Sequence, residues 1–305
     1  MSPAWRGTIA VLLSACCFGS ISPLTVIATG EGMALESIQS WRYVTSAVLL
    51  LLLGALRRTP DTPAATSSDV QPWYSLRILL PTGGGQALVA TLALAALNWL
   101  PAATSSFLFY TYPAWVTVIT AVRGLEPLDR PRLIALALSL AGVAAMVGAP
   151  DAGSLNPIGL IVILSAALVY ALYIPFLGHI QRSRDPLDVS RAIAVGGSIC
   201  FVAWSVAAGT LWVIPSPLAF GASVLQGILG AVSFLGFLAG LRQLGAVRTS
   251  ITSTVEPFWT TMLGIVLLGQ PLGRGTIVGG ILIMAAVLLL QRPAGGTPVR
   301  AETSA

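Results

Sequence analysis

Long apolar runs separated by short polar segments make up almost the whole chain. A membrane-spanning helix needs about 20 mostly apolar residues, and ten runs approach that length. The longest polar segment, Arg57 to Ser75, is rich in Thr, Ser, Pro and Asp, which is typical of a flexible loop. We therefore expect an all-α integral membrane protein with ten transmembrane helices. The predicted spans are 6–28, 36–56, 76–97, 103–122, 132–149, 157–179, 189–211, 219–241, 248–268 and 275–291.

One pattern occurs twice in these runs. The matches are Pro113, Trp115, Thr117, Pro127 and Leu128 with Pro257, Trp259, Thr261, Pro271 and Leu272 at a shift of 144, and Gly7 and Pro23 with Gly159 and Pro175 at a shift of 152. Five spans per unit is an odd number, so the second unit enters the membrane inverted. We expect two inverted five-helix repeats, at 1–149 and 150–292, and a flexible cytoplasmic tail at 293–305.

The composition places the chain in a bilayer. It is 55% hydrophobic and only 9% charged, with a mean hydropathy of +0.86. The net charge of +5 would suggest a nucleic-acid partner in a soluble protein, but here the basic residues are spread along the loops. We therefore expect the lipid bilayer and small solutes as partners, and no nucleic acid.

The basic residues also predict the topology, because cytoplasmic loops carry an excess of Arg and Lys. Thirteen arginines flank alternate loops or a terminus, and only Arg274 lies in a loop against this pattern. The sequence predicts a multi-pass protein of the bacterial inner membrane with both termini cytoplasmic. The thirteen are Arg6, Arg57, Arg58, Arg77, Arg123, Arg130, Arg132, Arg182, Arg184, Arg242, Arg248, Arg292 and Arg300.

Three cysteines, Cys16, Cys17 and Cys200, fall inside apolar spans, so we expect them to pack rather than to form disulfides. Leu13 to Cys16 also resembles a lipoprotein processing site, but the apolar run continues past it to Ala28.

Four prolines near the middle of spans indicate which helices line the substrate path. A proline removes one backbone hydrogen bond and leaves the carbonyl four residues earlier without its donor. Interrupted helices at matching positions of inverted halves point to a midplane substrate path, although some proline kinks only bend a helix. The predicted hinges are Pro23, Pro113, Pro175 and Pro257, and the freed carbonyls are those of Gly19, Phe109, Ala171 and Ser253.

The ninth span is unusually polar, with Glu256 among seven Ser and Thr residues between Thr249 and Thr261. An ionised carboxyl facing lipid at this depth costs at least about 2.5 kcal/mol, so Glu256 should face inwards. It could couple transport to protons, recognise a substrate ammonium group, or simply hydrogen-bond to another helix. Its counterpart in the first repeat is Tyr112, so the site is asymmetric.

Aromatic residues with polar tips suit an amphipathic organic ligand. We predict a substrate cavity lined from the third, fourth, sixth and ninth spans. Trp41, Trp73, Trp99 and Trp212 lie at span ends instead and fit the interfacial belt. The predicted cavity residues are Asn98, Phe109, Tyr110, Tyr112, Tyr170, Tyr173, Ser253, Glu256 and Thr260.

Arg42 lies inside the second span, where it could pair with a substrate carboxylate or with Glu36. Arg191 holds a comparable place in the seventh span beside Asp188, and local ion pairs are the commoner role for both. Small-residue faces such as Gly236-x-x-x-Gly240 fit contacts within one chain as well as dimerisation, so the oligomeric state stays open.

The sequence offers no enzyme chemistry. Gly83 to Gly85 lacks the Lys of a phosphate loop, no spacing fits a metal site, and no Ser has a His partner. We expect neither catalytic residues nor a metal or cofactor.

Two five-helix units, each with Pro-x-Trp-x-Thr followed by Leu125-Glu126-Pro127-Leu128 or Leu268-Gly269-Gln270-Pro271-Leu272, resemble the drug/metabolite transporter superfamily of the EamA-repeat kind. The aromatic, charge-poor interior is similar to the bacterial aromatic amino acid exporters of the YddG type. This resemblance implies helices one to four and six to nine around a central cavity, with alternating access by rocking of the halves.

We therefore expect a secondary transporter that exports amino acids, mostly aromatic and other neutral ones, and related metabolites. The alternative within the same fold is a multidrug or quaternary-cation effluxer. A third class is a membrane-embedded enzyme or a lipid scramblase, but the sequence offers neither the nucleophile nor the metal cluster that such an activity would need.

Overall fold

The computed structural model describes residues 3–57, 72–100, 102–126, 129–147, 156–269 and 274–290. These residues form helices and connecting turns with no strand among them, which confirms the all-α class. The elements are α1 (Pro3–Gly19), α2 (Ile21–Gly30), α3 (Leu35–Arg57), α4 (Leu76–Leu79), the π-helical turn η1 (Leu80–Gly84), α5 (Gly85–Ala96), α6 (Ala102–Phe109), α7 (Tyr112–Val122), α8 (Arg130–Val147), α9 (Pro157–Ile180), α10 (Pro186–Ala207), α11 (Pro217–Leu244), α12 (Ala246–Thr252), α13 (Val255–Leu268) and α14 (Arg274–Leu290).

Six helical stretches in the described residues are long and apolar enough to cross a membrane. Each of the ten predicted spans coincides with helical structure, but the fourth, fifth, ninth and tenth are not among these six stretches. The six long stretches are Trp5–Gly30, Leu35–Arg57, Leu76–Ala96, Pro157–Ile180, Pro186–Ala207 and Pro217–Leu244.

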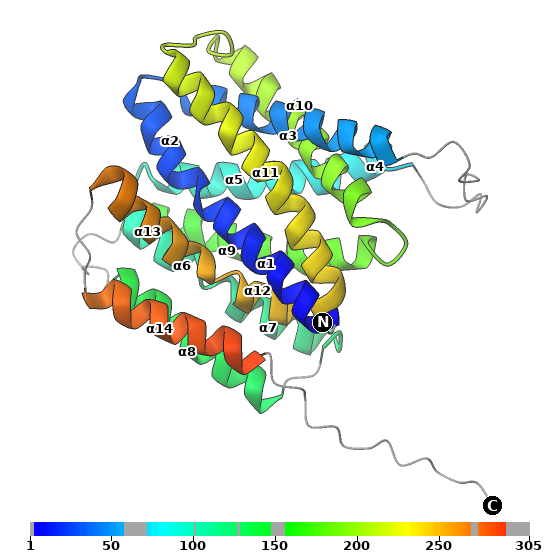
Figure 1. Ribbon diagram of the computed structural model, residues 1–305, viewed down its shortest axis with the longest axis vertical. Coiled ribbons are helices and arrows are strands. Elements are labelled where there is room, and N and C mark those ends of the chain that lie inside the picture. Colours follow the sequence, from blue (N-terminus) through cyan, green and yellow to red (C-terminus); the bar gives the residue numbers. More distant parts are fainter. Residues whose placement is uncertain are drawn as a thin grey trace, which may run out of the picture.

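The helices pack as interlocked pairs drawn from both halves of the chain. Helix α1 lies along α11, and α9 lies along α5. Figure 1 shows α8 and α14 side by side at one edge of the bundle, and α3 with α10 at the opposite edge. The two halves therefore share one core rather than forming two separate bundles.

Glycines allow the closest helix contacts. A Cβ on Gly83 of η1 would lie 2.3 Å from the Cα of Gly196 in α10, so the two backbones touch. A Cβ on Gly240 would lie 2.2 Å from a methyl carbon of Val11 in α1. The small-residue face of α11 is therefore occupied by a helix of the same chain.

Three spans are interrupted beside their prolines. The helix breaks at Ser20 before Pro23, at Tyr110 and Thr111 before Pro113, and at Ser253 and Thr254 before Pro257. The fourth differs from expectation, because α9 runs unbroken through Pro175. Pro175 removes one backbone hydrogen bond from α9. The remaining backbone hydrogen bonds and the packing of α9 on α5, α6 and α7 keep the helix continuous.

Candidate substrate site

The breaks of the first and ninth spans meet each other. A Cβ on Gly19 would lie 2.8 Å from the backbone oxygen of Glu256, so the helices touch at this point. Thr260 Oγ1 donates to the Gly19 carbonyl at 2.8 Å, and Trp259 Nε1 donates to Ser20 Oγ at 2.9 Å. The carbonyl freed by Pro23 thus receives a donor from the opposite half of the chain.

Five aromatic rings from the fourth and sixth spans form a connected cluster. Phe109 stacks on Tyr170 with ring centroids 5.6 Å apart, and Tyr112 meets Tyr170 edge-on at 4.8 Å. Tyr110 adjoins Tyr112, and Tyr173 adjoins Tyr170, at centroid distances of 6.2 and 6.5 Å. All five were predicted to line one cavity, and the structure brings them together.

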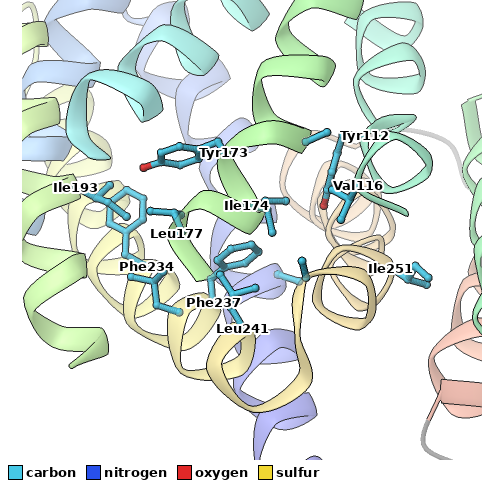
Figure 2. Close-up of a cluster of buried hydrophobic side chains, with 14 of the residues drawn as sticks. Tyr112, Val116, Tyr173, Ile174, Leu177, Ile193, Phe234, Phe237, Leu241 and Ile251 are labelled. Atoms are coloured by element: carbon cyan, nitrogen blue, oxygen red, sulfur yellow. The ribbon is translucent and has the colours of Figure 1, made fainter. Parts of the chain in front are cut away.

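The cluster is joined to the ninth span and to the third. The Tyr112 hydroxyl donates to the Ser250 carbonyl at 3.5 Å. The Tyr173 hydroxyl donates to the Thr82 carbonyl in the π-helical turn. Figure 2 shows Tyr112 on α7 and Tyr173 on α9 as part of the same buried layer, with α11 beneath.

Glu256 lies on the first turn of α13 and is only partly buried. Its carboxyl lies near the Tyr110 side chain and in the same interior region as the Arg42 guanidinium. The hydroxyls of Ser250, Ser253 and Thr254 instead donate to carbonyls of their own helix. The polar face of the ninth span is therefore largely satisfied from within, and Glu256 is its chemically distinct member.

The two membrane arginines differ in their partners. Arg191 Nη1 forms a 2.7 Å salt bridge with Asp188, as the sequence predicts. Arg42 does not pair with Glu36, whose Oε1 accepts from Thr210. Its Nη1 donates to Gln39 at 3.0 Å instead.

A small cavity of about 10 Å³ lies beside the aromatic cluster. Tyr170 and Tyr173 line it together with Phe18, Gln86, Phe234 and Phe237. These last four were not predicted, although Gln86 carried a signal as the one amide side chain within the predicted span 76–97. The volume suits about one water molecule, so an amino acid does not fit unless the helices move.

Asn98 lies apart from this cluster. It is exposed at the end of α5, and its side-chain amide donates to the Ala95 carbonyl within the same turn. Pro127, Leu128, Pro271 and Leu272 of the repeated pattern fall outside the described residues.

Comparison with known proteins gives a family match over both halves. The sequence profile of the EamA-like transporter family matches residues 5–148 and again 157–292. "Uncharacterized transporter YcbK" of Bacillus subtilis is 25% identical over 291 residues, covering 90% of this chain and 89% of its own. An "Uncharacterized transporter" of Archaeoglobus fulgidus is 24% identical over 290 residues, covering 94% of this chain and 96% of its own.

A third relative and one solved structure extend the match. "Uncharacterized inner membrane transporter YicL" of Salmonella typhimurium is 27% identical over 205 residues, 62% of this chain and 64% of its own. A structure titled "Crystal structure of protein" superposes with a TM-score of 0.76 at 16% identity, covering 93% of this chain and 96% of its own. At that identity the superposition shows the fold alone.

Proposed function

Because this chain belongs to the EamA-like transporter family and is a multi-pass membrane transporter, we propose that it exports neutral amino acids, aromatic ones above all, by alternating access. The observation that carries this proposal is the Glu256 carboxyl beside Tyr110 at the edge of the Phe109, Tyr112 and Tyr170 cluster. An interior acid suits a substrate ammonium group, and the rings suit an aromatic side chain.

The pairing of helices supports two inverted repeats of five spans. Helix α1 packs on α11, and its counterpart α9 packs on α5, the counterpart of α11. A Cβ on Gly7 would meet Leu244 at the end of α11, and one on Gly159 would meet Leu100 after α5. Equivalent glycines thus make equivalent contacts in the two halves, as a pseudo-twofold axis in the membrane plane requires.

The small cavity supports a mechanism in which the halves rock. A site closed around about 10 Å³ binds nothing as large as phenylalanine. Rearrangement at the broken spans, where α1 meets α2 and α12 meets α13, would open the cluster to one side of the membrane. The arginine-rich loops favour a cytoplasmic position of both termini in a bacterial inner membrane.

Transport by the purified protein in liposomes tests the proposal. We expect uptake of labelled Phe, Trp, Tyr, Met and Thr down a gradient, and a comparison with and without a pH gradient reports proton coupling. Transport of another solute class without any of these five amino acids would reject it. Empty liposomes, tested in parallel, give the passive leak of each solute.

The same site also favours a second candidate, efflux of quaternary cations. A carboxyl beside several aromatic faces is the usual environment of a quaternary ammonium group. In that case Glu256→Gln should abolish transport of tetraphenylphosphonium, whereas uncharged solutes should move as before.

A further inference from the structure

We propose that Arg42 and Gln226 form a carboxylate-binding site, so that the substrates are solutes with a free carboxylate. This inference rests on the proposed function and deepens it, because it assigns the acidic end of the amino acid to a particular side chain.

Arg42 is a buried cation whose hydrogen bonds are incomplete. Its exposed fraction is 8%, and its Nε has no hydrogen-bond partner among the described residues. Its nearest polar side-chain partner, Gln39, is neutral. Burying a guanidinium without an anion is costly, and proteins normally complete such a group with a carboxylate.

Arg191 is the matched case within the same chain. It is 6% exposed and lies near one end of α10, as Arg42 lies near one end of α3, and these two helices pack on each other. Both guanidinium groups lie over an aromatic ring, Tyr43 at 5.0 Å for Arg42 and Trp73 at 5.7 Å for Arg191. Arg191 in addition binds Asp188 at 2.7 Å and the Leu50 carbonyl at 3.1 Å, the latter through its Nε. The chain therefore supplies an anion to one buried arginine and none in direct contact with the other.

A second unpaired donor lies on α11, the helix that packs on α3 beside Arg42. Gln226 on α11 is fully buried, and its Oε1 accepts from Thr25 at 3.2 Å, but its Nε2 has no partner in the described residues. Gly230 follows one turn later on the same face of α11. The position of a Gly230 Cβ lies 2.8 Å from Ser46 Oγ and 3.9 Å from Arg42 Nε, so this glycine lets the guanidinium lie against α11.

A carboxylate fits these donors because it only accepts hydrogen bonds and can take two or more at once. Glu256 provides the opposite charge for the other end of the substrate, since its carboxyl lies in the same interior region as Arg42. No salt bridge joins these two side chains in the part of the chain that the structure describes. An α-amino acid, with a carboxylate and an ammonium group, would bridge them.

The experiment compares phenylalanine with phenylalaninamide, which keeps the ring and the ammonium group but lacks the carboxylate. In liposomes, the wild-type protein should transport phenylalanine at least about tenfold better, the ratio expected for a charge-assisted hydrogen bond. Arg42→Gln should reduce this preference to near one by slowing phenylalanine alone. Arg42→Lys, which keeps the charge but not the planar fork, should retain part of it.

Arg191→Gln is the control. It should lower the thermal unfolding midpoint without changing the ratio between the two solutes, because Arg191 already has Asp188 as its anionic partner. Equal transport of both solutes by the wild type would overturn the proposal, and so would an unchanged ratio in Arg42→Gln. If Arg42→Gln does not fold, the wild-type ratio and Arg42→Lys still decide the question.

Failure of the proposed function gives a different result. If the wild type transports no amino acid, amino acid export is wrong. Thermal stabilisation by 3-phenylpropionate, which has the carboxylate without the ammonium group, then tests Arg42 separately. Stabilisation of the wild type and of Arg191→Gln, but not of Arg42→Gln, would sustain the carboxylate site; no stabilisation of the wild type would reject it.

Discussion

The hydroxyl of Thr260 donates a 2.8 Å hydrogen bond to the backbone oxygen of Gly19, although the two residues are 241 positions apart. Gly19 lies four residues before Pro23, which has no N–H to offer this oxygen. The interruption of the first span is thus stabilised by a side chain of the ninth. Movement at one break must therefore affect the other.

Removing this donor should destabilise the protein. In Thr260→Val the shape is kept but the Gly19 oxygen loses its partner, so we expect a loss of about 0.6–2 kcal/mol. Thr260→Ser keeps the hydroxyl and should lie close to the wild type. The midpoint of thermal unfolding in detergent measures both variants, and equal midpoints for Val and Ser would show that the bond contributes nothing.

The sequence predicts one side of this relationship and not the other. Mid-span prolines indicate where carbonyls such as that of Gly19 lose their donors, because the rule is local. The identity of the donor depends on how distant helices pack, which no local pattern gives. For the same reason Glu256 could be predicted to face inwards, but its neighbour Tyr110 could not be named.

Pro175 and Asn98 show the limits of prediction from the sequence pattern alone. A proline that matches Pro23 suggests a second break, but α9 stays continuous because its neighbours hold it on several sides. Asn98 is polar and next to an apolar run, but its amide satisfies the last turn of its own helix. Helix positions follow from periodicity and length, whereas the way each polar group is satisfied follows from packing.

Two adjacent glycines should respond differently to the same substitution. A Cβ on Gly83 would lie 2.3 Å from the Cα of Gly196, which is backbone and must move. Gly83→Ala should therefore separate η1 from α10 and cost about 1–3 kcal/mol. Gly84 has no atom within 4 Å of its added Cβ and helical dihedral angles, so Gly84→Ala should not destabilise the protein.

Thermal unfolding of the two alanine variants gives this comparison directly, with composition held constant. A similar loss of thermal stability in both variants would mean that any side chain added to the π-helical turn disturbs the turn. The contact with Gly196 would then not be the cause of the destabilisation.

Glu126 connects the two halves at the start of the ninth span. Its Oε1 accepts hydrogen bonds from the backbone N–H groups of Ala246 at 2.5 Å and Val247 at 3.3 Å. These N–H groups have no acceptor within the first turn of α12. Glu126→Ala should thus cost about 0.5–2 kcal/mol, the usual loss when a helix loses its cap.

Glu126→Gln separates the hydrogen bond from the charge. The amide oxygen still accepts, so only the interaction of the negative charge with the helix terminus is lost, about 0.3–1 kcal/mol. We expect unfolding midpoints in the order wild type, Gln, Ala. If the unfolding midpoint of Glu126→Gln is as low as that of Glu126→Ala, the charge alone accounts for the effect.

Residues 31 and 183 test the inverted repeat directly. They are equivalent at the shift of 152 that aligns Gly7 with Gly159, and both Glu31 and Ser183 are exposed in the turn that follows the first span of their repeat. An odd number of spans per repeat puts equivalent turns on opposite sides of the membrane.

In a background with Cys16, Cys17 and Cys200 replaced, a membrane-impermeant thiol reagent should label Glu31→Cys in intact cells. It should label Ser183→Cys only after permeabilisation, since the flanking Arg182 and Arg184 favour the cytoplasm. Labelling of both from the same side would mean that the repeats are parallel. The paired contacts of α1 with α11 and α9 with α5 would then need another explanation, and a transport mechanism based on two inverted repeats would have to be abandoned.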